Sequence, residues 1–341
     1  MPAKLGQSWY LSQYAKEGFP SSVSEGGLLF TSAHIQEEKD LYSLLPNLLK
    51  EARQKGVRTV VDIDLGTIQD YGCSSLQEFQ QKMQADLLRL DDGFSLEEIL
   101  SISRTIPVAL NASTLSSLEK KQILQNAPKT LFIHNFYPRP ETGLDWQTFA
   151  QLNEGIPAEN TAVFICGDIR KRGPLFMGLP TLEEHRSLPP YAAYVQLRKL
   201  GLENILLGDP GLSDVQKKMM DDFEDGILTL PVSDLDDQYC SQVFALRPDS
   251  PAGLKRLSGT RRYGKIGREI VPSHTCERLS GSITQDNVKY GRYSGEIMMM
   301  IHDYDADEKV NVIGHVQPAY LPLLKVIDNS DQIRYVQGEK I

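Results

Sequence analysis

The sequence predicts an α/β protein in which a TIM-like (β/α)8 barrel precedes a smaller, mostly-β domain. A chain of 341 residues exceeds the usual size of a single hydrophobic core, so two domains are expected. Short apolar segments alternate with amphipathic stretches up to about residue 225, which indicates a parallel sheet with helical crossovers. After Gly226, short strands between turn residues replace this pattern. We therefore expect a barrel domain over residues 1–226 and a β domain over residues 227–341.

Eight apolar segments of strand length occur in the first domain, as a closed parallel barrel requires. They are Leu5–Leu11, Gly27–Ser32, Thr59–Leu65, Leu87–Leu90, Pro107–Asn111, Thr130–Asn135, Ala162–Cys166 and Asn204–Leu207. Helical patterns lie between most of them, over Leu41–Lys55, Leu96–Arg104, Leu115–Gln125 and Tyr191–Leu200. The first spacer is short and contains Gly18, Pro20, Gly26 and Gly27, so we expect a reduced or missing first helix and an irregular barrel.

The second domain is predicted to consist of short strands joined by Gly, Pro, Asp and Asn turns. The expected strands are Ile227–Val232, Val243–Leu246, Gly295–Ile301 and Val310–His315. A helical pattern occurs only near the end, at Tyr320–Val326.

Composition excludes several classes of protein. A net charge of −9 argues against a general nucleic-acid binder, because a phosphate backbone needs a basic face, although a few arginines can still hold a small anion. The N-terminus lacks the apolar core of a signal peptide, and no segment is long enough to span a membrane. The four cysteines are scattered without a Cys-x-x-Cys pair, so we expect no zinc site, no disulfide framework and a cytoplasmic location.

The segment His134–Leu144 is the most informative part of the chain. It directly follows a buried strand, two prolines flank Arg139, and Gly143 permits a turn before the next helical pattern. A stiff loop rich in polar and aromatic residues at the end of a barrel strand is typical of an active-site wall. The alternative is a solvated loop with a few partly covered aromatic side chains.

Nearly every predicted barrel strand ends in polar residues. These residues are Thr31, Ser32, His34, Asp62, Asp64, Asp91, Asn111, Ser113, His134, Asn135, Asp168 and Asp209. In a barrel these ends converge on one mouth, where Glu141 from the loop after the sixth strand would join them. Individually, each aspartate can instead form a turn or cap a helix, and His34 can be a hydrogen-bonded structural histidine. Together they predict an acidic cleft.

Several carboxylates in one cleft favour either a divalent metal or general acid–base chemistry. The sequence has no His-x-His or His-Glu-x-x-His motif, whereas glycoside cleavage needs only two carboxyl groups. We assign the catalytic roles to Asp91 and Glu141, with Asp209 and Asp62 as alternates, and expect neither a metal nor a cofactor. Whether the reaction retains or inverts is left open. The expected sugar platform comprises Trp9, Tyr10, Asn111, Asn135, Phe136 and Tyr137.

Basic residues after the seventh strand predict an anion site, which is common at this place in barrels. Arg172, His185 and Arg186 can form charge-assisted hydrogen bonds to phosphate oxygens. Part of this stretch is explained by a helix start, since Thr181 and Glu184 have the spacing of a capping box. In the β domain, Arg262 and Arg292 are read either as solvated turn residues or as groups that close over the mouth.

Three segments resemble the MupG-type 6-phospho-N-acetylmuramidases: His134–Leu144, Arg172–Arg186, and Ser280–Asn287 followed by Tyr290–Tyr293. The resemblance implies a TIM-like barrel with a cyclophilin-like β domain. It also implies hydrolysis of the β-1,4 bond of N-acetylmuramic acid 6-phosphate–N-acetylglucosamine during bacterial peptidoglycan recycling in the cytoplasm. Matches to the family fall on Asp62, Asp91, Asn111, Asn135, Arg139, Glu141, Arg172, His185 and Asp209. The chain departs from the family at Asp64, where a small residue is expected, and in its short Tyr14–Phe19 segment.

Two other functions remain open at this stage. One is a metal-dependent aldolase or isomerase acting on a sugar phosphate in the same barrel, and the other is a non-catalytic carbohydrate- or peptide-binding protein. The expected partner is a phosphorylated amino-sugar disaccharide, with no nucleic acid and no membrane insertion. A homodimer is expected only on general grounds, because symmetric oligomers are common.

Overall fold

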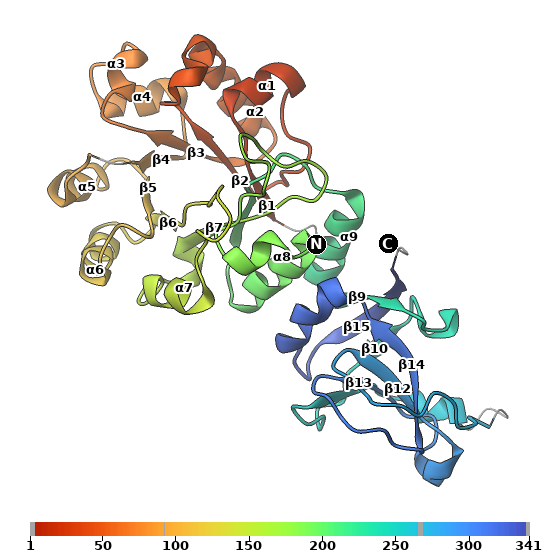
Figure 1. Cartoon of the computed structure of the whole chain (residues 1–341). Helices are drawn as coiled ribbons and strands as arrows, with labels where there is room; N and C mark the ends of the chain where they lie inside the picture. The colour runs from red at the N-terminus through yellow and green to blue at the C-terminus, as the bar shows by residue number, and fades with distance from the viewer. Residues whose placement is uncertain (1–3, 92, 265–268, 339–341) are drawn as a thin grey trace. The chain divides into compact units, whose positions relative to one another are not determined.

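The computed structural model describes residues 4–338 except residues 92 and 265–268. Two compact units make up the chain, and the division falls between Gln216 and Lys217. In Figure 1 the first unit runs from red to green and the second continues to blue. Among the described residues, no helix combines the length and apolar character needed to cross a membrane.

The first unit is a closed parallel barrel whose eight strands are hydrogen-bonded in chain order, which confirms the predicted fold class (Figure 1). The strands are β1 (Leu5–Ser8), β2 (Leu28–Ser32), β3 (Arg58–Ile63), β4 (Leu87–Leu90), β5 (Val108–Asn111), β6 (Leu131–Ile133), β7 (Thr161–Ile165) and β8 (Asn204–Leu207). Two of them, β4 and β8, have the predicted bounds. Two others, β1 and β6, are shorter than predicted: α1 already begins at Leu11, and β6 loses Thr130 at its start and His134 and Asn135 at its end.

Helices cover the outside of the barrel (Figure 1). The α-helices are α1 (Leu11–Glu17), α2 (Leu45–Gln54), α3 (Thr67–Asp70), α4 (Leu76–Met83), α5 (Leu96–Ile102), α6 (Ser117–Asn126), α7 (Trp146–Leu152) and α8 (Pro190–Lys199). A further α-helix, α9 (Asp214–Glu224), contains the division between the two units. The 3-10 helices are η1 (Gln36–Leu44), η2 (Ala158–Asn160) and η3 (Glu183–Arg186). The first helix is reduced to seven residues, as its glycine- and proline-rich spacer predicts. Capping boxes at Ser95–Glu98 and Ser116–Glu119 start α5 and α6.

Every second residue of a barrel strand faces the interior. The side chains that fill the interior are Leu28, Phe30, Val60, Leu87, Ala109, Leu131, Ile133, Ala162, Phe164 and Leu206. The same alternation, continued toward the carboxyl ends of the strands, puts Asp62, Arg89, Asp91, Asn111 and Asn135 on the inward side. Residues of the other parity pack against the helices. This periodicity decides which polar strand ends belong to the mouth.

The second unit contains a mostly antiparallel seven-stranded sheet in the order β10-β15-β9-β14-β12-β13-β11. Its strands are β9 (Ile227–Ser233), β10 (Val243–Ala245), β11 (Leu254–Arg256), β12 (Ser282–Asp286), β13 (Ile297–Met300), β14 (Val310–Val316) and β15 (Gln332–Gln337). The four predicted strands are present, and β11, β12 and β15 are additional. The helical pattern at residues 320–326 belongs to a 3-10 helix, η7 (Pro318–Lys325), since Pro322 lies inside it. The other 3-10 helices are η4 (Asp237–Tyr239), η5 (Thr260–Gly264) and η6 (Val288–Tyr293).

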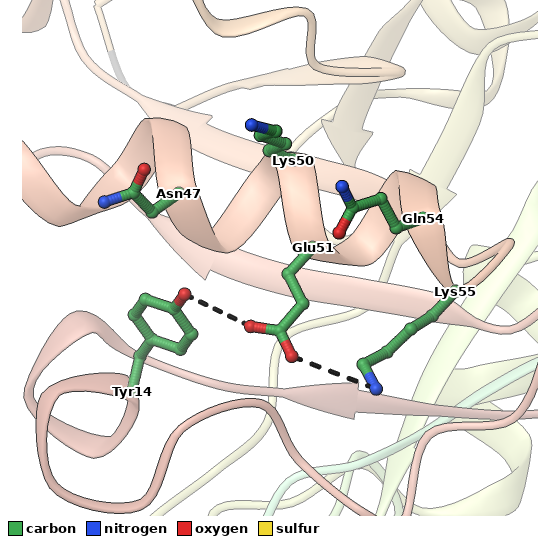
Figure 2. Close-up of a pocket in the computed structure, with 6 residues that line it drawn as sticks. All are labelled: Tyr14, Asn47, Lys50, Glu51, Gln54 and Lys55. Carbon is green, nitrogen blue, oxygen red and sulfur yellow. Dashed lines mark hydrogen bonds and ion pairs between the residues drawn. The ribbon is translucent and has the colours of Figure 1, made fainter.

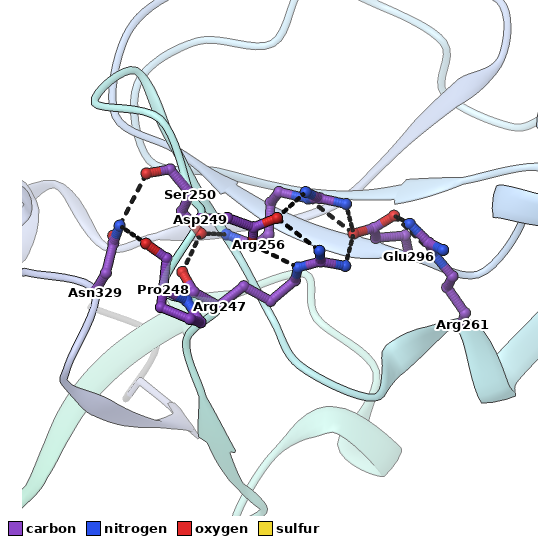
Figure 3. A network of polar contacts seen from close by, with 8 residues as sticks. All are labelled: Arg247, Pro248, Asp249, Ser250, Arg256, Arg261, Glu296 and Asn329. Carbon is purple, nitrogen blue, oxygen red and sulfur yellow. Dashed lines mark hydrogen bonds and ion pairs between the residues drawn. The ribbon is translucent and has the colours of Figure 1, made fainter.

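A buried carboxylate, Glu296, organises the polar contacts of this sheet, as Figure 3 shows. Arg256 donates two hydrogen bonds to its Oε1 at 2.9 and 2.6 Å, and Arg261 donates two to its Oε2 at 2.9 and 2.8 Å. Arg247 lies 3.7 Å from Oε1 and also pairs with Asp249. Both oxygens of Glu296 are therefore fully partnered, as the burial of a carboxylate requires.

Candidate active site

Two carboxylates meet one buried guanidinium at the mouth of the barrel. Arg89 lies in β4, and its side chain is 5% exposed. It donates to Asp62 Oδ1 at 2.5 Å and to Asp91 Oδ1 at 3.0 Å. The side chain of Asp62 is 10% exposed, whereas that of Asp91 is 29% exposed. Asp62 is thus enclosed by its partners, and Asp91 is the more accessible carboxylate of the two.

His34 adds an imidazole to this cluster from the end of β2. Its Nε2 lies 2.8 Å from Asp62 Oδ2 and 3.8 Å from Asp91 Oδ2, and its Nδ1 lies 3.8 Å from Asp64 Oδ2. The hydrogen bond with Asp62 is the main cause that raises the pKa of His34, and the neighbouring carboxylates outweigh the opposing effect of burial. The cluster therefore favours a protonated imidazole.

Asp64, the residue at which the chain departs from the family pattern, caps the turn into α3. Its Oδ1 accepts from the backbone N–H and the hydroxyl of Thr67, both at 2.8 Å. Burial alone would raise the pKa of Asp64, but these hydrogen bonds and His34 lower it. Asp64 adds a negative charge beside His34 without a direct contact to Arg89.

Two asparagines complete the inward layer. Asn135, at the end of β6, accepts a hydrogen bond from Arg89 Nη2 at 2.9 Å, so the guanidinium links three strand ends. Asn111, at the end of β5, accepts from the backbone N–H of Ser113 at 2.9 Å. The amide N–H groups of both side chains remain suited to sugar hydroxyl or acetamido groups.

Arg172 and Tyr10 form the opposite, cationic part of the mouth. The Arg172 guanidinium stacks on the Tyr10 ring at 4.3 Å from its centroid and donates from Nη2 to the carbonyl oxygen of Ser8. Nε and Nη1 of Arg172 are inaccessible to solvent and have no hydrogen-bond partner among the described residues. A buried guanidinium with unsatisfied donors is suited to an anionic partner, although solvent does not reach these two nitrogens in this structure.

Asp209 supports the loop that carries Arg172. It is fully buried two residues beyond the end of β8, and the alternation of that strand, in which Leu206 faces inward, would turn Asp209 the other way. Its carboxylate accepts from the backbone N–H groups of Arg172 at 2.9 Å, Gly167 at 3.1 Å and Leu179 at 3.3 Å. The Asp209 oxygens are thus occupied by the loop that they shape.

The loop after β6 carries Tyr137, Arg139 and Glu141. Tyr137 is half-buried, while Arg139 and Glu141 are exposed. Glu141 has a left-handed backbone with φ of 70°, and its backbone N–H donates to Glu183 Oε1 at 2.9 Å. The Glu141 side chain is therefore exposed, while its backbone is fixed by the hydrogen bond to Glu183.

Two histidines of the informative segments lie inside the protein. His134 is fully buried beside Phe149 and pairs with Asn153 Oδ1 at 3.0 Å, and burial lowers its pKa to about 4. His185 is also fully buried and pairs with Gln196 Oε1 at 3.1 Å, and burial lowers its pKa to about 4. Both rings are therefore neutral near pH 7, and they lie in the interior beneath the loops of the mouth.

The two arginines predicted in the β domain belong to the second unit. Arg262 in η5 is exposed and donates to Gln242 Oε1 at 3.3 Å. Arg292 in η6 is exposed, with its guanidinium 4.9 Å from the centroid of the Tyr293 ring. Within this unit both make contacts typical of surface side chains.

One group of side chains has the composition of a metal site. His34, Asp62 and Asp91 each offer a ligand atom within 4.8 Å of the others. Arg89 already donates to both carboxylates, so a divalent ion would have to compete with a buried guanidinium. The cluster is better matched to charge balance by Arg89 than to metal binding.

A shallow polar pocket lies between α1 and α2, away from the residues predicted for the site (Figure 2). Within it, Glu51 accepts from the Tyr14 hydroxyl at 3.2 Å and pairs with Lys55 at 3.8 Å. Asn47, Lys50 and Gln54 complete its lining. Ordinary surface helix residues make this pocket, and it adds no catalytic group.

Sequence reasoning missed Arg89 and Glu38. Arg89 stands in the apolar strand Leu87–Leu90, where a lone charge at an inward position was the available signal. Glu38 is buried and accepts from the backbone N–H groups of Leu11 and Ser12 at 3.0 Å, which fixes the start of α1 beside the mouth. No local pattern marks Glu38, since its partners lie 26 and 27 residues away.

Comparison with known proteins adds an independent line of evidence. The chain matches the family model for the N-terminal part of 6-phospho-N-acetylmuramidase over residues 7–222 and the model for its C-terminal part over residues 228–336. The structure is similar to that of a conserved Enterococcus faecalis protein described as having an unknown function. The TM-score is 0.82 at 28% identity, and 99% of this chain and 97% of that chain are covered.

A second solved structure, of an uncharacterized B. cereus protein, has a TM-score of 0.74 at 23% identity, over 99% of this chain and 100% of that chain. It shows a likeness of fold alone. The comparison with curated proteins gave no match.

Proposed function

Because the chain belongs to the 6-phospho-N-acetylmuramidase family of glycosidases, we propose that its barrel mouth cleaves N-acetylmuramic acid 6-phosphate–N-acetylglucosamine at the β-1,4 bond. The family name supplies the phosphorylated muramic acid sugar, and the disaccharide and its linkage are our inference from the resemblance. The reaction belongs to peptidoglycan recycling in the cytoplasm in this proposal, since the substrate would be phosphorylated during uptake.

The observation that carries the proposal is the division of charge across the mouth. Carboxylates gather at the ends of β3 and β4, around Arg89 and His34. After β7, Arg172 offers two buried donors without partners among the described residues. Glycoside hydrolysis needs carboxyl groups at the bond, and a sugar phosphate needs a cation set apart from them.

Asp91 and Glu141 are our proposed catalytic pair. Asp91 is the most accessible carboxylate that Arg89 contacts, and Glu141 stands on the stiff wall after β6. Asp62 is enclosed by Arg89 and His34, so we give it the role of holding them. Asp209 shapes the loop of Arg172, and in this proposal its role is to hold that loop and not to act on the bond that is cleaved.

The remaining predicted residues receive binding roles. In this proposal Arg172 holds the 6-phosphate, and Arg139 orients the sugar or its lactyl carboxylate. Asn111, Asn135 and Tyr137 bind hydroxyl or acetamido groups, which fits their side-chain chemistry. His185 supports this wall from the interior without touching substrate. Arg262 and Arg292 stay predictions of the sequence and have no part in this mechanism.

The decisive experiment incubates the purified protein with the 6-phosphorylated disaccharide and with its unphosphorylated form, and measures release of N-acetylglucosamine. We expect release from the phosphorylated form only. Release from neither would refute the hydrolase, and equal rates would refute the phosphate site. Arg172→Gln should raise KM about 10- to 100-fold, because it removes a charge-assisted contact.

The same assay separates the metal-dependent alternative that His34, Asp62 and Asp91 raise. Turnover measured after dialysis against a chelator should equal that of the untreated enzyme. Loss of turnover that added Mg²⁺ or Mn²⁺ restores would show that cleavage depends on a bound metal, and it would refute the proposed metal-free acid–base mechanism.

A further inference from the structure

A bidentate ion pair joins two loops of the barrel mouth. Glu183 and Arg186 both lie in η3, where Arg186 donates from Nε to Glu183 Oε1 at 2.6 Å and from Nη2 to Oε2 at 2.7 Å. The same carboxylate accepts from the backbone N–H groups of Glu141 at 2.9 Å and Gly143 at 2.8 Å. Glu183 therefore links the segment after β7 to the loop after β6.

Arg186 makes the connection from the other side. Its Nη2 donates to the carbonyl oxygens of Tyr137 at 2.9 Å and Arg139 at 3.2 Å, and its Nη1 donates to that of Gly178 at 2.9 Å. The Arg186 side chain is only 10% exposed. With a longer contact from Nη1 to the carbonyl oxygen of Met177 at 3.4 Å, one guanidinium holds four backbone carbonyls in the two loops, which a flexible ammonium cannot do with the same geometry.

The contacts of Glu183 stabilise the ionised form of its carboxyl group. Its hydrogen bonds with Arg186 are the main cause that lowers its pKa to about 2, and the N–H groups of Glu141 and Gly143 add to this effect against burial. The Glu183 carboxylate is therefore ionised at every pH at which the protein would be assayed.

The backbone that Glu183 binds is strained. The φ of 70° at Glu141 is unfavourable for a residue with a Cβ and persists only where surrounding contacts hold it. Strained backbone is frequent at functional sites because it fixes the direction of a side chain. A Cβ at Gly143 would lie 2.6 Å from Glu183 Oε2, so only glycine fits against the carboxylate there.

We propose that the Glu183–Arg186 pair is the positioning device of the active site: it holds the backbone of Glu141, and so aims the Glu141 carboxylate at the substrate. The inference rests on the proposed function, in which Glu141 is catalytic. Neither Glu183 nor Arg186 needs to touch the substrate in this role.

The test measures kcat and KM for three variants on the phosphorylated disaccharide. Glu183→Gln removes the carboxylate that pairs with Arg186. Arg186→Lys keeps the positive charge but removes the planar guanidinium and its bidentate hydrogen bonds. Gly143→Ala displaces Glu183 without removing any charge. Each should lower kcat about 10- to 100-fold and change KM by less than about threefold, as expected for a displaced catalytic group.

A matched control is available on the same side of the barrel. Arg170 and Glu17 form another bidentate pair, at 2.9 and 2.7 Å, and within the described part of the chain this pair makes no hydrogen bond to the loop after β6. Glu17→Gln should leave kcat and KM unchanged. If Glu17→Gln and Glu183→Gln lower kcat equally, the specific role of Glu183 is refuted.

A double-mutant cycle separates this inference from the proposed function. Where Glu183 acts through Glu141, the double variant Glu141→Gln/Glu183→Gln should be no slower than Glu141→Gln alone. Full activity of Glu141→Gln would overturn the catalytic role of Glu141 and the positioning role with it. An inactive Glu141→Gln beside a Glu183→Gln enzyme with unchanged kcat would overturn the positioning role alone.

Discussion

The two units each contain a cluster of buried charge, and the clusters differ in balance. In the second unit, the single carboxylate Glu296 receives four hydrogen bonds from Arg256 and Arg261 (Figure 3). In the barrel, the single guanidinium of Arg89 is shared by Asp62 and Asp91. The first cluster gathers guanidinium groups around one buried carboxylate, whereas the second gathers carboxylates around one buried guanidinium, with His34 beside them.

The difference shows that a buried ion pair does not by itself mark a functional site. Glu296 has no oxygen left for a ligand, so its cluster stabilises the sheet. At the barrel mouth Asp91 is 29% exposed, and His34 lies beside carboxylates at 2.8 and 3.8 Å. An incompletely neutralised cluster that solvent can reach is the kind of environment in which enzymes place reactive groups.

The largest expected effect comes from removing charge at the mouth. Asp91→Asn should lower kcat by about 10²- to 10⁴-fold, the usual contribution of a general acid or base. The thermal unfolding midpoint of the variant should change little, because Asp91 is partly exposed and Arg89 retains its ion pair with Asp62. The measurement is release of N-acetylglucosamine beside a thermal melt. Normal turnover of Asp91→Asn would remove it from the catalytic pair.

The corresponding change in the second unit should act on stability. Glu296→Gln leaves Arg256 and Arg261 without their common carboxylate, which should cost about 3 kcal/mol, the lower end for a broken buried pair because both guanidiniums are partly exposed. Denaturant unfolding measures the loss, and kcat at 25 °C should equal that of the wild type. A large loss of kcat in the folded variant would show that the two clusters are not functionally distinct.

A smaller effect is expected at Asp286, which lies near Glu296. Asp286 is buried, and its Oδ1 has no hydrogen-bond partner among the described residues. Burial, followed by repulsion from Glu296 and Asp307, raises its pKa from 3.8 to about 7. Because the folded state binds this proton more tightly than the unfolded state, its contribution to stability falls as pH rises from about 4 to 7.

Asp286→Asn should therefore stabilise the second unit above pH 7, by on the order of 1–3 kcal/mol, with the difference fading toward pH 4. Urea unfolding of both proteins at several pH values between 4 and 8 measures it. A pH-independent difference would mean that the cause is packing and not titration.

Much of the fold could be predicted because burial leaves a simple pattern. The barrel strands are buried on both faces, so β4 and β8 appear as continuous apolar segments with the predicted bounds. The strand β12 was missed because its sequence, Ser282–Asp286, is polar even though every residue is buried. In β15 the buried residues Ile333 and Tyr335 alternate with more exposed ones, a pattern that is typical of a strand and that the prediction overlooked.

The site was less predictable because it depends on strand parity and on distant contacts. The sequence prediction grouped His134 with Asn135, yet period two turns Asn135 inward to Arg89 and His134 outward to Phe149. Parity could have been applied to the sequence alone. The contacts of Glu183 with Glu141 and Gly143 could not be predicted from the sequence alone, since they join residues that are 42 and 40 positions apart.

The smallest expected effect separates the two kinds of histidine by the sign of their pH dependence. The pKa of His34 is raised by Asp62, so its stabilisation is complete below its unfolded value of 6.5 and is lost as pH rises through the folded pKa. Burial lowers the pKa of His134 to about 4, so the protein loses stability as pH falls from 6.5 toward 4.

Unfolding free energies of His34→Gln and His134→Gln, each compared with the wild type from pH 4.5 to 8.5, should therefore show opposite trends. The wild type should exceed His34→Gln most at low pH, and its advantage over His134→Gln should shrink at low pH. Parallel trends would show that His34 is a neutral structural histidine like His134. The imidazole would then add no positive charge to the acidic mouth, and Arg89 alone would offset only part of the negative charge of Asp62 and Asp91.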